Sequence, residues 1–182
     1  MASDSVTIPA AEYVELRKLL DRQQIEDCLS RIARGTDRFD VELALSACHP
    51  GAQFSVGGEI TTAEESLNGG KEMHAAVTHA TLHCLSTMSC DIQGDEAHVE
   101  TYHLYCARST DETCWAATGR YVDRFEKRGG KWGLTFRHIA VEWAGKLSPM
   151  DFDLLTPPGA PKVRLGASRD RDDVSYLRPL TA

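Results

Sequence analysis

The sequence lacks the features that mark membrane, secreted and nucleic-acid-binding proteins. No apolar run approaches the roughly 20 residues of a membrane span, and residues 1–10 hold no basic stretch followed by an apolar one, as a secretory signal would. Lysine and arginine total 20 against 27 aspartates and glutamates, and the net charge of −7 disfavours a phosphate backbone or an anionic membrane as partner. We therefore expect a cytoplasmic protein with no nucleic-acid and no membrane partner.

Motifs for metal, nucleotide and covalent chemistry are also missing. No C-x-x-C pair occurs among the six cysteines, which are Cys28, Cys48, Cys84, Cys90, Cys106 and Cys114. Without a secretory signal we expect them to be reduced and partly buried, and a disulfide framework or a zinc site is less favoured. The chain has no glycine-rich nucleotide fingerprint and no serine or cysteine in a nucleophile-elbow sequence. We expect no cofactor and no metal.

The full chain has 182 residues, which suffice for one domain. Helical patterns dominate its first third. Two apolar stripes at helical spacing follow residues 13–20 and 25–32, and they are out of phase with each other. This shift predicts two helices with a break near Asp21, which would cap the second. Gly35 is expected to end that second helix in the left-handed conformation.

Capping residues and helix-stopping residues predict the elements between residues 40 and 79. The first is a short helix over 41–47, capped by Asp40 and ended by His49-Pro50, and a strand over 53–56 follows it. A small helix then begins at the capping box Thr62-Ala63-Glu64-Glu65 and ends at Gly69-Gly70. The last element is a further helix over 71–79.

The second half of the chain changes to β-rich runs joined by short glycine-containing turns, which are hairpin signals. The runs cover residues 82–92, 97–109, 114–126 and 132–143. Helices followed by such a meander predict an α+β fold, with helices packed on one face of an antiparallel sheet. We expect one domain over residues 9–147, a disordered N-terminus over 1–8 and a C-terminal extension over 148–182. That extension would be mobile or surface-lying, or would cross a neighbouring subunit.

Two polar residues stand where the local pattern favours blander side chains. Asp37 follows the expected end of the second helix, where carboxylates are usually solvated. His83 interrupts an apolar strand opening between Leu82 and Leu85, where a structural histidine is commoner than a catalytic one. Neither residue by itself indicates a function.

Arg137 is the most unusual of the polar residues in the strands. By the alternation of a strand it shares one face with Thr135, Ile139, Val141 and Trp143. If that face points inward, the guanidinium is buried and needs a charged partner. The partner is either a carboxylate such as Glu100 or Asp123, or an anionic ligand.

Asp37, His83 and Arg137 together match a proton-transfer site if the fold brings them together. A carboxylate bound to one imidazole nitrogen fixes the tautomer and leaves the other nitrogen basic. A guanidinium then stabilises negative charge that develops on an oxygen or leaving group. Such a set needs no nucleophile, so it points to proton abstraction and elimination rather than hydrolysis.

Several segments resemble the SnoaL-like family of the nuclear-transport-factor-2-like superfamily. They are Arg31–Asp40, Cys48–Ala52, Thr81–His83 and Gly119–Glu126, and the resemblance covers roughly residues 10–147. It implies a cone-like barrel, in which a strongly curved sheet wraps around N-terminal helices and leaves a deep apolar pocket at its open end.

The resemblance also implies roles for the polar residues. Scytalone dehydratase, hexachlorocyclohexane dehydrochlorinase and bile acid 7α-dehydratase use an aspartate–histidine pair without a cofactor. Asp37 and His83 match that pair, and Arg137 matches an arginine of the dehydrochlorinase site.

The chain departs from scytalone dehydratase at two tyrosines. Thr36 stands where the first is expected, and Phe54 occupies the strand that would carry the second. Other donors are then needed, and His103 and Tyr105 are candidates because they share a face of the next strand. With Phe54 and Trp143 they complete the predicted substrate contacts.

The sequence therefore predicts a cofactor-independent lyase of dehydratase type, acting on a hydrophobic, aromatic or polycyclic small molecule with His83 as general base. Retro-aldol cleavage, such as formaldehyde release from a lignin-like diaryl compound, isomerisation and polyketide cyclisation use the same logic and stay open. A non-catalytic binding module or accessory subunit is the alternative of another class.

An apolar outer sheet face is expected to be covered by a second copy of the chain. Met88, Cys90, Tyr102, Leu104 and Cys106 would supply that patch. We therefore expect a homodimer or a homotrimer.

Overall fold

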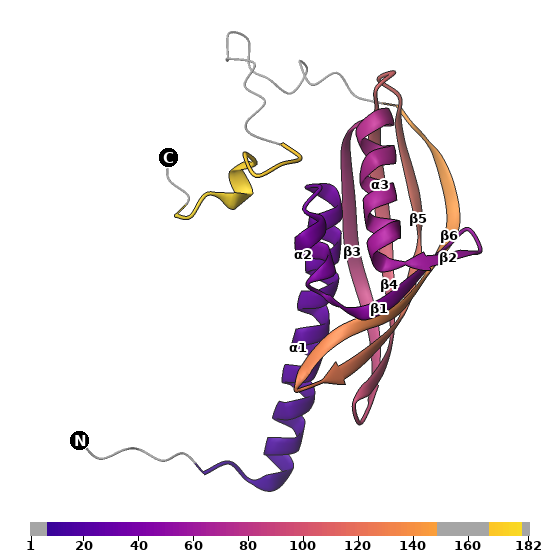
Figure 1. Ribbon diagram of the computed structural model, residues 1–182. Helices are drawn as coiled ribbons and strands as arrows, with labels where there is room; N and C mark the ends of the chain where they lie inside the picture. The colour runs from indigo at the N-terminus through magenta and orange to yellow at the C-terminus, as the bar shows by residue number, and fades with distance from the viewer. Residues whose placement is uncertain (1–6, 149–167, 180–182) are drawn as a thin grey trace.

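A curved six-stranded sheet and a long N-terminal helix make up the computed structural model (Figure 1). The structure describes residues 7–148 and 168–179. The sheet order is β2-β1-β6-β5-β4-β3, and only β1 and β6 are parallel within it. The strands are β1 (Cys48–Val56), β2 (Glu59–Thr62), β3 (Thr78–Gln93), β4 (Glu96–Ser109), β5 (Cys114–Arg128) and β6 (Lys131–Leu147). The predicted α+β class and the meander of four long strands are confirmed.

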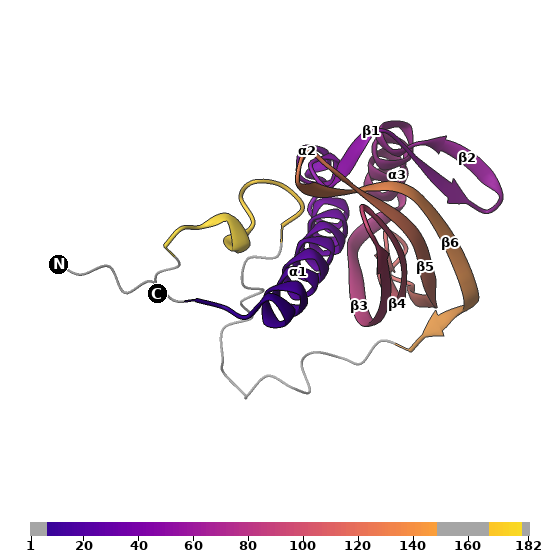
Figure 2. The ribbon, with the colours of Figure 1, turned by 90° about the horizontal axis from the view of Figure 1, so that it is seen from below.

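The first helix, α1 (Ala10–Asp37), is continuous, so the predicted break near Asp21 is wrong. Asp21 lies mid-helix and accepts a hydrogen bond from Lys127 Nζ of β5 at 2.7 Å. The two apolar stripes differ in phase because their surroundings differ: residues 25–32 face the core, whereas the apolar side chains of residues 13–20 are exposed. Figure 2 looks roughly along α1 and shows β3 beside the helix, with the sheet curving through β4 and β5 to β6, whose beginning returns to α1.

Gly35 does not end α1, because the helix runs two residues further. A Cβ built on Gly35 would lie 2.7 Å from the backbone nitrogen of Ala44 and 2.7 Å from the carbonyl oxygen of Asp40. Glycine is therefore required by the close approach of α2 (Val41–Leu45) to α1 rather than by a left-handed backbone.

Two predicted helix caps are confirmed. The Asp40 side chain accepts a hydrogen bond from the Leu43 N–H at the start of α2. Thr62 and Glu65 form a complete capping box at the start of α3 (Ala63–Val77). The predicted stop at Gly69-Gly70 is wrong, because both glycines are helical and α3 continues to Val77. One 15-residue helix thus replaces the two predicted ones.

The core fills the space between α1 and the concave face of the sheet. Ile25, Cys28 and Ile32 of α1 meet Phe125 of β5 and Leu134 of β6, and all five are almost fully buried. This packing fixes which face of each strand points inward. The six cysteines are free thiols, buried or half-buried, and no helix of the described residues is long and apolar enough to cross a membrane.

A register shift in β3 corrects part of the predicted outer patch. The shift lies between Leu85 and Met88, so that Met88 pairs with the buried Thr101 and turns inward, as does Cys90. Tyr102 and Leu104 remain exposed on the outer face, at 49% and 40%. The homodimer or homotrimer stays a prediction.

A second register shift separates Trp143 from the face that carries Arg137. Thr118 pairs with Trp143, but the next residue of β5, Gly119, pairs with Val141. Trp143 therefore takes the outer face, with 54% of its surface exposed, so its predicted place on one face with Arg137 is wrong, and its role as a substrate contact stays a prediction. A Cβ on Gly119 would lie 1.9 Å from the Ala140 carbonyl oxygen, so the shift requires glycine there.

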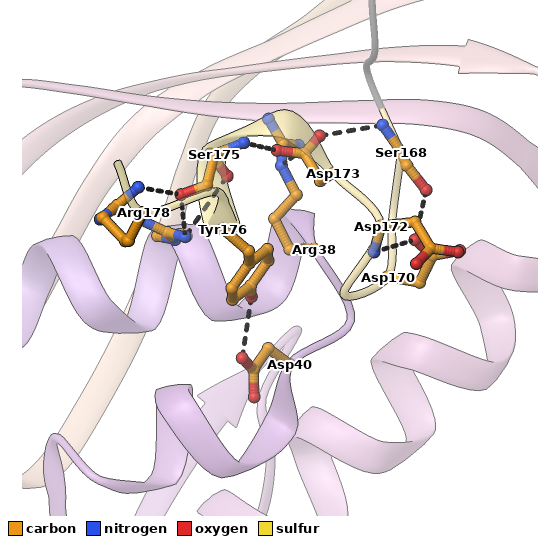
Figure 3. Close-up of polar contacts among 10 residues, drawn as sticks. Arg38, Asp40, Ser168, Asp170, Asp172, Asp173, Ser175, Tyr176 and Arg178 are labelled. Carbon is orange, nitrogen blue, oxygen red and sulfur yellow. Dashed lines mark hydrogen bonds and ion pairs between the residues drawn. The ribbon is translucent and has the colours of Figure 1, made fainter. Parts of the chain in front are cut away.

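Residues 168–179 fold against the C-terminal end of α1 (Figure 3). Asp173 accepts hydrogen bonds from the backbone N–H groups of Ser168 and Ser175, and Nε of Arg38, the residue that follows α1, lies 3.3 Å from its carboxylate. The Tyr176 hydroxyl donates to Asp40 at 2.8 Å. This part of the predicted extension thus lies on its own chain. The rest of the extension, and residues 1–6 of the predicted disordered N-terminus, are outside the described residues.

Candidate active site

Asp37 and His83 meet at the junction of α1 and β3. Asp37 is the last residue of α1, and His83 points inward from β3. Asp37 Oδ1 lies 2.6 Å from His83 Nδ1, and Asp37 Oδ2 accepts the backbone N–H of His83 at 2.8 Å. The two side chains are 7% and 12% exposed. The predicted convergence of this pair is therefore present in the structure.

The geometry of the pair fixes the roles of the two imidazole nitrogens. An ionised carboxylate only accepts hydrogen bonds, so the proton of a neutral His83 resides on Nδ1 and Nε2 keeps its lone pair. A carboxylate at a helix C-terminus is disfavoured by the helix dipole. The two hydrogen bonds from His83 offset that repulsion and hold the imidazole in one orientation.

Tyr105 of β4 lies opposite His83, with the two ring centroids 4.8 Å apart. Its hydroxyl is 3.2 Å from Nδ1 of His74, which comes from α3. Burial raises the pKa of Tyr105, which stays a neutral phenol, and burial lowers the pKa of His74, which stays a neutral imidazole. Tyr105 was predicted at the site, and the structure places it beside the pair.

His74 was not among the site residues predicted from the sequence. The signal was available: in one continuous helix, Ala63, Leu67 and His74 fall on the same face, and the first two are buried. The predicted stop at Gly69-Gly70 hid that face.

Arg137 forms the ion pair with Asp123 that the sequence left as an alternative to ligand binding. Its Nε and Nη2 lie 2.9 and 2.7 Å from the two carboxylate oxygens. The Arg137 and Asp123 side chains are 4% and 0% exposed. Burial raises the pKa of Asp123, and the guanidinium opposes that effect. The guanidinium also lies over the Tyr121 ring, 4.1 Å from its centroid.

His103 connects Arg137 to the His83 side of the concave face. It stacks on Tyr121 with ring centroids 4.2 Å apart and nearly parallel planes. Burial lowers the pKa of His103 to about 4, and the neighbouring His83 and Arg137 act in the same direction. Its Nδ1 is buried and has no hydrogen-bond partner among the described residues. Phe54, also buried, lies 5.7 Å from the Arg137 guanidinium.

A hollow of about 340 Å³ reaches the pair between α1 and β3. Its lining residues are Ser30, Ala33, Arg34, Asp37, Arg38, His83 and Leu85. The deep apolar pocket inside the cone stays a prediction. Within the described residues, no group of three or more His, Cys, Asp or Glu side chains is arranged to hold a metal ion.

Solved structures of the same fold include a type 2 hexachlorocyclohexane dehydrochlorinase (LinA), with a TM-score of 0.69, 19% identity and coverage of 80% of this chain and 99% of that one. A type 3 LinA from Novosphingobium barchaimii has a TM-score of 0.68 and 18% identity, over 79% of this chain and 99% of that one. A scytalone dehydratase-like protein from Novosphingobium aromaticivorans has a TM-score of 0.64 and 19% identity, over 73% of this chain and 91% of that one. At these identities the likeness concerns the fold alone.

No curated protein matches the chain in sequence. The family model of the SnoaL-like domain matches residues 17–138, which include Asp37, His83 and Arg137. The chain belongs to the SnoaL-like family, with the nuclear-transport-factor-2-like cone as its fold.

Proposed function

We propose that the protein is a cofactor-independent lyase that eliminates water from a hydrophobic, aromatic small molecule, with His83 as general base. The observation that carries the proposal is the double hydrogen bond from His83 to Asp37, at 2.6 and 2.8 Å. It directs the basic nitrogen of the imidazole away from the carboxylate.

The proposed reaction needs no group besides the pair. His83 Nε2 takes a proton from a carbon next to a carbonyl, the electron pair of the C–H bond forms the new double bond, and the C–O bond to the leaving hydroxide breaks. The hydroxide then takes the proton from the imidazolium, so water leaves and the imidazole is neutral again. Asp37 stabilises the imidazolium between the two steps.

Three further features support an elimination on an aromatic substrate. The Tyr105 ring lies between the rings of His83 and Trp115, with centroids 4.8 and 5.0 Å away, and these rings are ones on which an aromatic ligand would stack. Dehydrochlorination and dehydration, after which two proteins of the same fold are named, are both eliminations. An imidazole held in one orientation by a carboxylate is also suited to accept a proton on its second nitrogen.

The test is a screen of hydroxylated aromatic ketones for loss of 18 mass units, with the wild type, His83→Ala and His98→Ala. His98 is an exposed histidine of the adjacent strand and serves as the matched control. We expect His83→Ala to lower kcat/KM by about 10²–10⁴-fold and His98→Ala to have no effect. Retained turnover in His83→Ala would sink the mechanism, and ligand binding without any turnover would favour a binding module.

A further inference from the structure

Tyr105 and His74 form a second hydrogen-bonded pair on the far side of His83 from Asp37. Tyr105 is 7% exposed, and its hydroxyl lies 3.2 Å from His74 Nδ1. The mechanism above uses neither residue. A pair of this kind next to a general base is placed to bind a polar group of the ligand.

The direction of the hydrogen bond decides what Tyr105 offers to a ligand. A phenolic O–H is a strong donor, and the lone pair of a neutral imidazole is a strong acceptor. The Tyr105 proton therefore points at His74 Nδ1, and the oxygen lone pairs remain for another partner. Since the donated bond draws electron density to that oxygen, it becomes a better acceptor. This reverses the sequence-based expectation that Tyr105 acts as a donor.

Arg169 of the C-terminal segment lies near the same pair. Its Nη1 donates to the Thr78 carbonyl oxygen at 2.7 Å, and the Thr78 hydroxyl donates to the His74 carbonyl oxygen at 2.7 Å. Its guanidinium stacks on the Phe39 ring, 3.9 Å from the centroid. Its Nε is buried and has no hydrogen-bond partner in the part of the chain that the structure describes.

The electrostatic neighbours of this corner come from four elements. Tyr105 of β4 and Asp37 of α1 are the charged or titratable groups that act on Arg169, and burial lowers the pKa of its guanidinium. His83 of β3 and Arg169 both disfavour a proton on His74 of α3. A neutral His74, a neutral Tyr105 and a cationic Arg169 are the resulting states.

We propose that Tyr105 and Arg169 form a subsite for one hydroxyl group of the substrate, with His74 as the residue that positions Tyr105. The substrate hydroxyl donates to Tyr105 Oη and accepts from Arg169 Nε–H. The substrate class is therefore an alcohol or phenol. A methyl ether lacks the donor, and a carboxylate meets the lone pairs of Tyr105. As a statement about a substrate, this inference rests on the proposed function, although ligand binding tests it without turnover.

The first measurement is the tautomer of His74 in the ligand-free protein, read from long-range ¹H–¹⁵N correlations of the histidine rings. We expect the Nε2–H form, with an Nδ1 signal that shifts in Tyr105→Phe and not in the control His79→Gln, since His79 is exposed. An Nδ1–H tautomer would overturn the assignment of Tyr105 as acceptor.

The second measurement compares three probes, 2-naphthol, 2-methoxynaphthalene and 2-naphthoate, by NMR titration of the full chain. We expect 2-naphthol to bind at least about tenfold more tightly than the other two. Tyr105→Phe and Arg169→Met should each remove that preference. Arg171→Met is the matched control, because Arg171 lies two residues further in the same segment with a 70% exposed side chain.

Equal affinities of the wild type for the naphthol and its ether, or an unchanged preference in Tyr105→Phe, would contradict the subsite. Arg169→Lys distinguishes loss of the Nε donor from release of the whole segment, since lysine keeps the charge and lacks the fork. A hydroxyl preference without any turnover in the substrate screen would leave the subsite standing and remove the lyase. Turnover without a hydroxyl preference would support the lyase and remove the subsite.

Discussion

Two acid–base pairs lie on the concave side of the same sheet, and they differ in how completely each is closed. Asp123 and Arg137 join two neighbouring strands through two parallel hydrogen bonds, at 2.9 and 2.7 Å, and are 0% and 4% exposed. Asp37 and His83 join a helix end to a strand, and a hollow of about 340 Å³ reaches them. The first pair uses both carboxylate oxygens on one guanidinium, whereas the second leaves one imidazole nitrogen with a lone pair.

This difference is the one expected between a structural pair and the reactive pair that we propose. A buried bidentate pair is stable only while both charges are present, because each is the other's replacement for water. An open pair with a spare nitrogen exchanges protons with a ligand and contributes less to folding. We therefore base the roles proposed for the two pairs on how completely each is enclosed, because both pairs are charged.

The largest expected effect on stability comes from opening the closed pair. Arg137→Met should lower the free energy of unfolding by about 3–5 kcal/mol, because it leaves the Asp123 carboxylate buried without a partner. Urea denaturation followed by circular dichroism measures this. The double variant Asp123→Leu with Arg137→Met should recover most of the loss, and a double variant as unstable as the single one would argue against the pair as the cause.

A smaller effect follows from His103, which is neutral and stacked between the two pairs. Its pKa is lowered from 6.5 to about 4. Between these values the unfolded chain binds a proton that the folded chain does not, so stability falls as the pH falls from about 6.5 to about 4. The free energy of unfolding falls by roughly 3 kcal/mol over this range, because each pKa unit corresponds to about 1.4 kcal/mol.

His103→Phe removes the proton and keeps a ring to stack on Tyr121. Unfolding curves between pH 4 and 7 should therefore be flatter for this variant than for the wild type. Equal pH dependence in the two proteins would show that His103 is not the group that titrates.

The smallest effect on stability is expected at the open pair. Asp37→Asn keeps the shape of the side chain and replaces one acceptor by a donor, so it should lower the free energy of unfolding by only about 1 kcal/mol. Thermal unfolding of Asp37→Asn, Arg137→Met and the wild type under the same conditions compares the stability losses of the two variants. A loss as large as that of Arg137→Met would make both pairs structural.

Local signals in the sequence predicted the elements that depend on neighbouring residues. Asp40 caps α2 and Thr62 with Glu65 caps α3, since a cap involves residues only three positions apart. Gly35 was predicted as a stop, but its role depends on Ala44, which comes from another helix. Local patterns contain no information about that approach.

The candidate site was also predicted only in part. Asp37 and His83 were identified by their chemistry and by resemblance to a family, and they do hydrogen-bond to each other. Met88 and Trp143 were assigned to the wrong faces because strand alternation assumes a constant register, which bulges in β3 and β6 interrupt. Arg169 lies in a segment whose polar sequence predicted no fixed position.

The most direct test of the open pair is kcat/KM of Asp37→Asn relative to wild type, on the substrate that the screen identifies. The asparagine amide donates to His83 Nδ1 and so moves the imidazole proton to Nε2, the nitrogen that must accept the substrate proton. We expect kcat/KM to fall at least about 100-fold while the variant stays folded. A ratio within about threefold of wild type in a folded variant would contradict it.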